Sequence, residues 1–367
     1  MLRLTEAADG YLARIRLPGG LVGAGQMRVL ARLAGEFGDG RVELTSRGNV
    51  QLRALAADAG GPLTDELTRA GLLPSLSHDR VRNVLASPLA GLDGGPDLTG
   101  IVRDLDAALC ARPRLAELPG RFLFAVDDGR GDVADLGADV TALVGAEGTV
   151  VNGLATRGPG SEDGVVAVML ACAEAFLDEA AAQGGTAWRM TDLRDGDERI
   201  HAAVAARLGL AAAVPEPAAA RSPAPSRPVG LVGADGTAAV LLAPLGRLTS
   251  AQLTWLAGQV TGRPARITPW RSVVVPDLQD PGRTLGEAAG LGFGVDAASP
   301  WLRLTACAGQ PGCASALADV QADAAELGAR WPERIVHVSG CARHCGRPAA
   351  TQIDVTATSE GYEVAGV

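Results

Sequence analysis

The chain has 367 residues, 47% of them hydrophobic, and a formal net charge of −9 at pH 7. This length supports two or more domains with sizeable cores, and the negative charge excludes general nucleic-acid binding. No apolar run is long enough to span a membrane, the first residues lack a secretory-signal pattern, and six cysteines are too few for a disulfide scaffold. We therefore expect a cytoplasmic protein with reduced thiols and no membrane partner.

The basic residues are of one kind: all 33 are arginine, and the chain contains no lysine. Any anion site in this protein must therefore be built from arginine. The planar guanidinium fork pairs well with carboxylates, so an acidic ligand is favoured.

The first segment predicts a strand, a helix and a second extended stretch. Residues 11–17 alternate apolar and polar side chains, as a half-buried strand does. After a glycine-rich turn, residues 26–37 show helical periodicity and residues 41–55 read as extended. The glycines between strand and helix fail the spacing of a dinucleotide-binding loop, so we expect an external electron donor.

Residues 239–276 repeat this plan, with a strand at 239–242, a helix at 250–260 and an extended stretch at 265–276. The matched positions are Gln26 with Gln252, Leu30 with Leu256, and Thr45 with Thr268. An internal duplication of this kind predicts a pseudo-two-fold architecture in which the two copies pair with each other.

Each copy precedes a longer α/β stretch, with helices expected near 97–111 and 164–183 in the first. A proline-rich segment separates the two halves and has the composition of a linker. The predicted parts are half-domains at 1–73 and 229–289, α/β domains at 74–214 and 290–367, and a linker at 215–228.

Four of the six cysteines form two tight pairs near the C-terminus. Cys307 and Cys313 are separated by five residues, and Cys341 and Cys345 by three. Four thiolates that converge can hold a [4Fe–4S] cluster or a structural zinc. The five-residue gap fits a zinc knuckle poorly and favours the cluster, but zinc and four unliganded thiols both stay open on spacing alone.

The cysteine pattern and the duplicated half-domains resemble the nitrite/sulfite reductase family. Three further stretches agree, and the resemblance covers nearly the whole chain. They are residues 45–51 (Thr-Ser-Arg-Gly-Asn-Val-Gln), 81–91 (Val-Arg-Asn-Val-Leu-Ala-Ser-Pro-Leu-Ala-Gly) and 118–122 (Leu-Pro-Gly-Arg-Phe). The resemblance implies an α+β fold of two ferredoxin-like half-domains paired with two larger α/β domains, the second carrying the cluster. In the family, the last cysteine (Cys345 here) bridges the cluster to sirohaem iron.

The resemblance also assigns candidate catalytic residues. Arg47 and Arg82 match family arginines at the active site, and Arg121 matches a position that is lysine in the reductases. The second active-site lysine is replaced by Leu123, which can supply neither charge nor proton. Further candidates for substrate binding are Asn49, Gln51, Arg271 and His344.

The missing lysines, the bulky spacer of the second cysteine pair and the short chain point to one branch of this family, the precorrin-3B synthases. That branch implies precorrin-3A as substrate in place of sirohaem as prosthetic group. The implied reaction is O₂-dependent hydroxylation at C20 with γ-lactone formation, as part of aerobic cobalamin synthesis. A [4Fe–4S] cluster and a non-haem iron would take part, with electrons from NADH directly or through a redox protein. The alternative is a sirohaem-dependent sulfite or nitrite reductase.

Ligands for a mononuclear iron cannot be read from spacing. Such an iron usually takes two histidines and a carboxylate. Of the four histidines, His344 and His78 are the better candidates, because His344 lies between cluster cysteines and His78 shortly precedes Arg82. Cys110 and Cys172 lie in helical, apolar context and are expected to be core thiols.

Overall fold

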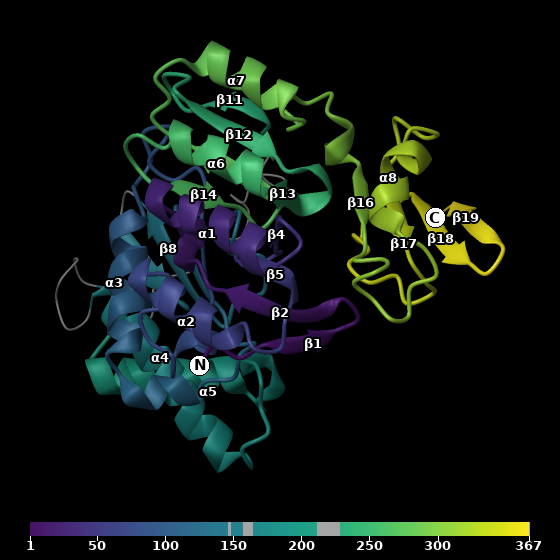
Figure 1. The fold of residues 1–367 in the computed structure, drawn as a ribbon. Helices are drawn as coiled ribbons and strands as arrows, with labels where there is room; N and C mark the ends of the chain where they lie inside the picture. The colour runs from purple at the N-terminus through teal and green to yellow at the C-terminus, as the bar shows by residue number, and fades with distance from the viewer. Residues whose placement is uncertain (146–147, 157–163, 211–227, 367) are drawn as a thin grey trace.

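The computed structural model describes residues 1–145, 148–156, 164–210 and 228–366. The predicted linker at 215–228 lies outside the described residues except for its last residue, Pro228. No helix in the described part of the chain is long and apolar enough to cross a membrane. The described residues form four sheets with helices packed on them, which is the predicted α+β class (Figure 1).

The two duplicated segments build two five-stranded sheets, and each sheet takes one strand from the other copy. The first has the order β1-β2-β5-β4-β13 and the second β11-β12-β15-β14-β3. Strand β13 of the second copy pairs antiparallel with β4, and β3 of the first copy pairs antiparallel with β14. This exchange joins the copies into one unit, so the predicted pairing is confirmed. The bounds are β1 (Thr5–Ala7), β2 (Gly10–Ile15), β3 (Leu21–Val22), β4 (Arg41–Leu44), β5 (Val50–Leu55), β11 (Gly230–Val232), β12 (Ala238–Leu242), β13 (Arg247–Thr249), β14 (Ala265–Ile267) and β15 (Ser272–Val275).

The equivalent helices of the two copies, α1 (Ala24–Phe37) and α6 (Ser250–Gln259), pack against each other (Figure 1). Both begin with the same cap: Gln26 Oε1 accepts from the Gly23 N–H at 3.0 Å, and Gln252 Oε1 accepts from the Thr249 N–H at 2.8 Å. This satisfies a backbone donor that a helix start leaves unpaired. The glutamines that revealed the duplication therefore act as matched helix caps. Two further helices, α2 (Gly60–Arg69) and α7 (Pro281–Gly290), close the pair of half-domains.

The first α/β unit follows the first half-domain. Its strands β6, β7 and β8 run parallel, and β9 and β10 continue the sheet in antiparallel fashion. Three aromatic rings fill its core: the Phe122 centroid lies 5.3 Å from that of Phe124 and 4.9 Å from that of Phe176. The bounds are β6 (Val84–Ala86), β7 (Phe124–Asp127), β8 (Val140–Gly145), β9 (Gly148–Val151), β10 (Leu154–Ala155), α3 (Thr99–Cys110), α4 (Val165–Ala182) and α5 (Gly196–Leu208).

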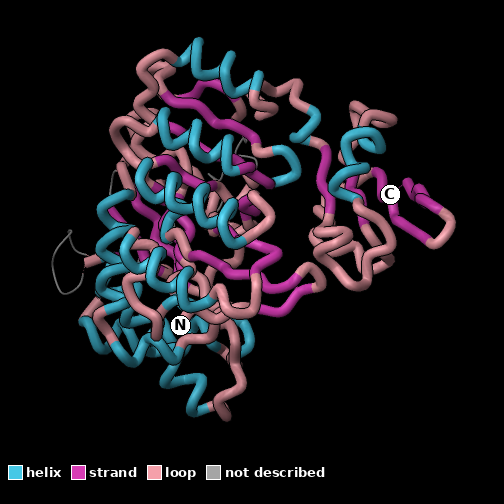
Figure 2. The backbone as a smooth tube through the Cα atoms, viewed as in Figure 1, coloured by secondary structure: helices cyan, strands magenta, loops and turns pink. Residues whose placement is uncertain are grey.

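The second α/β unit carries the four paired cysteines and lies beside the rest of the molecule (Figure 1). Its strands β16, β17 and β18 are parallel, β19 is antiparallel, and helix α8 lies between β16 and β17 in the chain. Figure 2 shows a strand, β16, on the side of this unit toward the half-domains, with loops gathered below it. The bounds are β16 (Leu304–Ala306), α8 (Val320–Gly328), β17 (Val336–Ser339), β18 (Ile353–Thr358) and β19 (Gly361–Gly366).

The two α/β units are copies of one plan, which the sequence did not predict. Both sheets contain three parallel strands followed by an antiparallel one, with a helix after the first strand. The strand registers of the two sheets correspond. In the first sheet Val84 pairs with Phe124 and Phe124 with Val140. In the second sheet Leu304 pairs in the same way with Val336, and Val336 with Ile353. The duplication therefore extends over both halves of the chain.

The predicted domain boundaries fall close to element ends. Residue 73 follows α2, whereas the boundary after residue 289 falls inside the last turn of α7. Ala288 of that helix is buried in the core shared by the two half-domains, so α7 belongs with them.

Candidate functional site

The two cysteine loops leave the ends of β16 and β17, which are neighbouring parallel strands. Cys307 follows β16 directly, and Cys341 follows β17 after one glycine. Parallel strands end at the same sheet edge, so both loops emerge side by side. The sulfur of Cys307 accepts a hydrogen bond from the Gly340 N–H at 3.1 Å, which ties one loop to the other.

The positions of the sulfurs bear on the zinc alternative that the spacing left open. Four thiolates on one tetrahedral zinc, each at about 2.3 Å, would stand about 3.8 Å apart. Among the described residues, which include all six cysteines, no three cysteine sulfurs lie within 4.8 Å of one another. The four thiols therefore do not form a ready-made tetrahedral zinc site in the described part of the chain. A [4Fe–4S] core holds its cysteines at separate corners and so further apart, and the amide-to-sulfur bond at Cys307 suits it.

Cys345 is the exposed member of the four, whereas the other three are half-buried. A ligand that approaches the cluster position from solvent would therefore meet the loop at Cys345 first. Of the two remaining thiols, Cys172 lies in the core as predicted, whereas Cys110 is half-buried at the end of α3; burial raises the pKa of Cys110 to about 11 and that of Cys172 to about 12.

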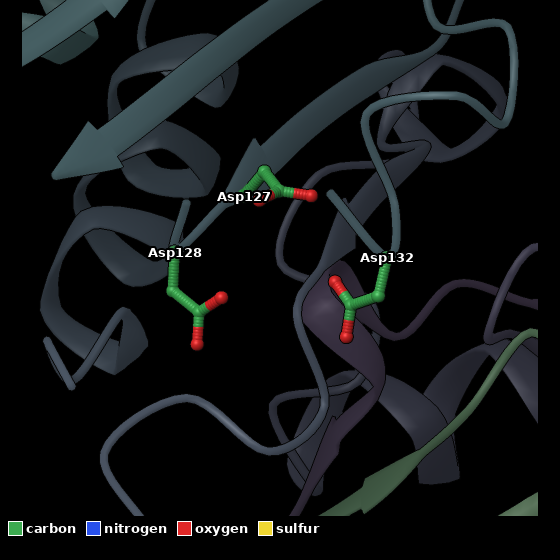
Figure 3. Close-up of side chains that lie close together, drawn as sticks. All are labelled: Asp127, Asp128 and Asp132. Atoms are coloured by element: carbon green, nitrogen blue, oxygen red, sulfur yellow. The ribbon is translucent and has the colours of Figure 1, made fainter. Parts of the chain in front are cut away.

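The first α/β unit has a different set of side chains at the position that corresponds to the cluster. Ser87 stands where Cys307 stands, and the Asp128 N–H donates to Ser87 Oγ at 3.2 Å, as the Gly340 N–H does to Cys307. The loop after β7 then brings together Asp127, Asp128 and Asp132 (Figure 3).

These three carboxylates are occupied mainly by their own loop. Asp127 accepts four backbone N–H bonds of 2.8–3.0 Å, Asp128 is held by Arg130, and Ser87 Oγ donates to Asp132 at 2.5 Å. Burial and the two neighbouring aspartates raise the pKa of Asp132 to about 6. The acidic group therefore shapes a loop in the place where the second unit has its cysteines.

A buried ion pair links the first cysteine loop, which carries Cys307 and Cys313, to the first half-domain. Arg53 on β5 donates to both oxygens of Asp9, at 3.0 and 3.1 Å, and its Nη2 also donates to the Gly312 carbonyl at 2.6 Å. Only 8% of the Arg53 side chain and 10% of the Asp9 side chain are exposed. Gly312 lies one residue before Cys313, so this contact fixes the first cysteine loop against the half-domain.

Arg47 and Arg121, both predicted from the resemblance, lie together at the edge of the first half. The Arg47 guanidinium donates to the backbone carbonyls of Gly120 at 3.3 Å and Arg121 at 3.4 Å. The pKa of Arg47 is lowered by burial and by the nearby charges of Arg189 and Arg121. Arg121 is exposed and stacks over the Trp188 ring at 5.9 Å. The two arginines thus form a cationic edge with few carboxylate partners.

Arg16 extends this cationic edge and was not predicted from the sequence. It follows β2 directly, and its Nε is buried without a hydrogen-bond partner among the described residues. Burial lowers the pKa of Arg16 to about 10, although the charge of Asp79 opposes this. The charges of Arg14, Arg47 and Arg82 lower it further, which places all four guanidinium groups in one neighbourhood. We call these four residues (Arg14, Arg16, Arg47 and Arg82) the arginine group.

Arg82 is the innermost member of the arginine group. It is 2% exposed, it forms a two-pronged ion pair with Asp106 at 2.7 Å, and its Nη1 donates to the Leu72 carbonyl at 3.0 Å. These bonds occupy its fork, so in this structure Arg82 contributes charge and position to the group. A direct contact with a ligand stays a prediction from the resemblance.

Asn49 and Gln51 differ in whether their side-chain NH₂ groups have hydrogen-bond partners within the protein. Asn49 Oδ1 accepts from the Leu17 N–H at 2.8 Å, but its Nδ2 is buried without a partner among the described residues. Gln51 Nε2 bonds to Glu43. Asn49 therefore retains a free donor near Arg47, whereas the amide group of Gln51 is used within the protein.

The histidines do not assemble a site for mononuclear iron. His78 uses both ring nitrogens, Nδ1 with Ser75 at 2.8 Å and Nε2 with the Arg112 carbonyl at 3.0 Å. It is structural, which corrects the sequence-based preference for it. His344 Nδ1 lies 3.9 Å from Asp354, but Arg347 already holds that carboxylate.

His337 is a second histidine in this region, and its Nε2 is buried without a partner in the described part of the chain. Burial lowers the pKa of His337 to about 4, so its ring is neutral. Among the described residues, His337, His344 and Asp354 do not bring their ligand atoms within 4.8 Å of one another. The residues present do not fit a preformed iron triad.

Comparisons with known proteins agree with this geometry. A family model described as the nitrite/sulfite reductase ferredoxin-like half domain matches residues 5–70. A ferredoxin–nitrite reductase from Synechococcus elongatus is 29% identical over 97% of this chain and 78% of that protein. The structure of the Mycobacterium tuberculosis NirA protein superposes with a TM-score of 0.73 at 21% identity, over 95% of this chain and 71% of that one.

The chain has the fold of the nitrite/sulfite reductases and contains their ferredoxin-like half domain at residues 5–70. Its relatives in this oxidoreductase family include a precorrin-3B synthase from Sinorhizobium sp, 28% identical over 97% of this chain and 79% of that protein. The predicted fold and family are thereby confirmed. The cysteine loops and the arginine group are the two candidate functional parts of this fold.

Proposed function

We propose that the protein is a precorrin-3B synthase, which hydroxylates precorrin-3A at C20 with O₂ and forms a γ-lactone. The observation that carries the proposal is a cationic site made of arginine alone. Arg16 and Arg47 form no ion pair within the described part of the chain, and Leu123, at the position of a reductase lysine, is 4% exposed in a small apolar cluster. Arginine holds carboxylates well but does not readily give up a proton.

A polycarboxylate macrocycle suits such a site better than a small oxyanion that must be reduced. Reduction of sulfite or nitrite consumes several protons, which positioned acids deliver in the transition state. The arginine group can bind and orient carboxylate side chains with two-pronged hydrogen bonds instead.

The donor set of the four paired cysteines fits a [4Fe–4S] cluster. Cys307, Cys313, Cys341 and Cys345 would hold it, and when bound it supplies one-electron transfer. The Gly340 N–H bond to Cys307 and the Arg53 contact to Gly312 keep the loops in place for it. The exposed position of Cys345 leaves one side of the cluster site open to a ligand.

The proposed reaction balances with an external reductant. One atom of O₂ enters the macrocycle as the C20 hydroxyl group, and the other leaves as water. The two electrons and two protons that this requires come from NADH and solvent, with NADH acting directly or through a redox protein. We place the reaction in the cytoplasm, and we derive no step through a mononuclear iron, because the histidines present do not form a site for it.

A sirohaem-dependent sulfite or nitrite reductase is the second candidate, because the nitrite reductase relative matches the same share of the chain at similar identity. Anaerobic purification followed by absorption spectroscopy and assays of iron and acid-labile sulfide separates the two. The synthase predicts a broad cluster absorption without sirohaem bands, and conversion of precorrin-3A only when O₂ is supplied. Sirohaem bands in the isolated protein, with reduction of sulfite or nitrite, would establish the reductase instead.

A further inference from the structure

The turn between β14 and β15 contains a strained arginine where the other copy has glycine. Arg271 has a backbone φ of 61°, and Gly48, at the same place in the turn between β4 and β5, has a φ of 63°. Both turns are closed by the same bond: the Thr45 N–H donates to the Asn49 carbonyl at 2.9 Å, and the Thr268 N–H donates to the Ser272 carbonyl at 2.9 Å. Arg271 is therefore the counterpart of Gly48, and not of Arg47.

This conformation is costly for a residue with a side chain. The left-handed region costs an L-residue roughly 1–2 kcal/mol, and non-glycine residues in it cluster at functional sites. The neighbouring turn also makes room for the side chain, because a Cβ added to Gly246 would lie 2.5 Å from Arg271 Cδ. Arg271 thus replaces the glycine of the other copy, and the turn at Gly246 leaves room for its long side chain.

The charge at the end of that side chain has no partner among the described residues. Within residues 1–145, 148–156, 164–210 and 228–366, no hydrogen bond or ion pair involves the Arg271 guanidinium. Burial lowers the pKa of Arg271, and the opposing charge is that of Glu43. Glu43 is already paired with Arg247 at 2.6 Å and bonded to Gln51. A half-buried guanidinium with all five donors free is unusual, since burial of an unpaired charge is unfavourable.

The guanidinium points to the cluster-carrying unit. Arg271 Nη2 lies 3.8 Å from the position that a Cβ on Gly346 would occupy, and Gly346 directly follows Cys345. A second unpartnered polar atom, Nε2 of the fully buried His337, belongs to the same region, because the charge of Arg271 lowers the pKa of His337. The junction between the second half-domain and the second cysteine loop, which carries Cys341 and Cys345, therefore holds two polar groups. Both lack partners in the described part of the chain.

We propose that Arg271 forms a second anion subsite, separate from the arginine group, that binds one carboxylate side chain of the tetrapyrrole beside Cys345. This inference rests on the proposed function and adds to it the residue that aligns the macrocycle with the cluster loop. The fork of Arg271 binds the carboxylate through two parallel hydrogen bonds. The bound anion supplies the counter-charge that the protein lacks there.

The structure offers a substitution that removes the side chain without harm to the fold. Arg271→Gly introduces the residue that the other copy has at φ 63°, so the folded state is relieved of strain. We expect its melting temperature to equal or exceed that of the unaltered protein. Arg271→Lys keeps the charge but not the fork, and Arg283→Gln alters an exposed arginine on α7 as the matched control.

Binding is measured anaerobically by the fluorescence of an octacarboxylate porphyrin (uroporphyrin), with the full-length protein. We expect Arg271→Gly to weaken its affinity by about 10- to 100-fold, the loss typical of a charged hydrogen bond, and Arg271→Lys to weaken it less. Arg283→Gln should bind as the unaltered protein does. In a second arm, succinate is titrated in place of the porphyrin.

Unchanged porphyrin affinity in a folded Arg271→Gly protein would overturn the subsite and leave the proposed function intact. The subsite is likewise overturned if succinate binding depends on Arg271 while porphyrin binding does not, since the ligand would then be a free carboxylate. If the unaltered protein binds no porphyrin at all, the proposed function fails and the subsite fails with it.

Discussion

Ser87 and Cys307 occupy the same position in two copies of one α/β unit. Each follows the first parallel strand of its sheet, and each donates its backbone N–H at 3.0 Å to the neighbouring strand. Each side chain accepts a backbone N–H from the residue that follows this neighbouring strand, Asp128 in one copy and Gly340 in the other. The Ser87 copy has a carboxylate loop at this edge, whereas the Cys307 copy has the remaining three cysteines. The duplicated scaffold thus presents two equivalent loop pairs, and one of them carries the four cysteines that we propose as cluster ligands.

The cysteine assignment predicts which thiols matter. Cys345→Ser removes one ligand from the exposed corner, so the purified protein should lose most of its iron, acid-labile sulfide and cluster absorbance, and with them substrate turnover. Cys110→Ala is the control, because this half-buried thiol lies on α3 in the other unit. Full iron content and activity in the Cys345→Ser protein would show that the cysteine alignment is misplaced.

Arg16 should combine a gain in stability with a loss of binding. Arg16→Met removes a half-buried guanidinium whose Nε is buried without a hydrogen-bond partner among the described residues, so the free energy of unfolding should rise by about 1 kcal/mol. The same change should weaken porphyrin binding by about tenfold or more, because one charged hydrogen bond is lost. Denaturant titration and fluorescence binding measure the two effects. A protein that is less stable but binds normally would contradict the assignment, and Arg32→Met, on the exposed face of α1, serves as control.

The Arg53–Asp9 pair should couple the half-domain to the cluster loop. Arg53→Met leaves Asp9 buried without its partner, which typically costs about 3–5 kcal/mol, and it frees the Gly312 carbonyl. Asp9→Asn and the double variant complete a cycle in which we expect a coupling free energy above about 1 kcal/mol. Cluster release under a chelator should be faster in Arg53→Met than in Asp9→Asn, because only the former loses the contact to the cluster loop. Equal release rates in the two variants would show that the Arg53 contact to Gly312 does not help to retain the cluster.

The raised pKa of Asp132 predicts a pH-dependent change in stability. Its pKa of about 6 exceeds the usual value of 3.8, so between these values the folded protein binds more protons than the unfolded chain. Stability is therefore lost as the pH rises through about 6, and Asp132→Asn should recover on the order of 1–3 kcal/mol at neutral pH. The gain should vanish below about pH 4, where Asp132 is protonated in both the folded protein and the unfolded chain. Denaturant titrations at several pH values check this, and a gain that is constant with pH would rule out titration of Asp132 as its cause.

The sequence predicted the half-domain duplication because its markers have one structural task in both copies. Gln26 and Gln252 cap equivalent helices, so both positions kept a side chain with the same hydrogen bonds. The duplication of the α/β units stayed hidden, because Ser87 and Cys307 share a backbone position but not a chemistry. Strands β3 and β13, which exchange between the sheets, have two and three residues and are too short for a periodic pattern.

The candidate site was predictable in part. Motif spacing brought out the cysteines and Arg47, because both occur in stretches that resemble the family. Arg16 lies at the end of a strand and Arg53 lies within one, and many surface arginines occupy such positions. Only burial in the folded protein distinguishes these two arginines from surface arginines. The role of Arg271 depends on a positive φ and on Gly246, two features that no local sequence signal reports.

The most direct test of the central claim is turnover of precorrin-3A under ¹⁸O₂, followed by mass spectrometry of the product. We expect one labelled oxygen in the product, at the C20 hydroxyl group, and a strict requirement for O₂ and reductant. A product without the label, or no conversion of precorrin-3A by a cluster-loaded protein that reduces sulfite or nitrite, would contradict the proposed function.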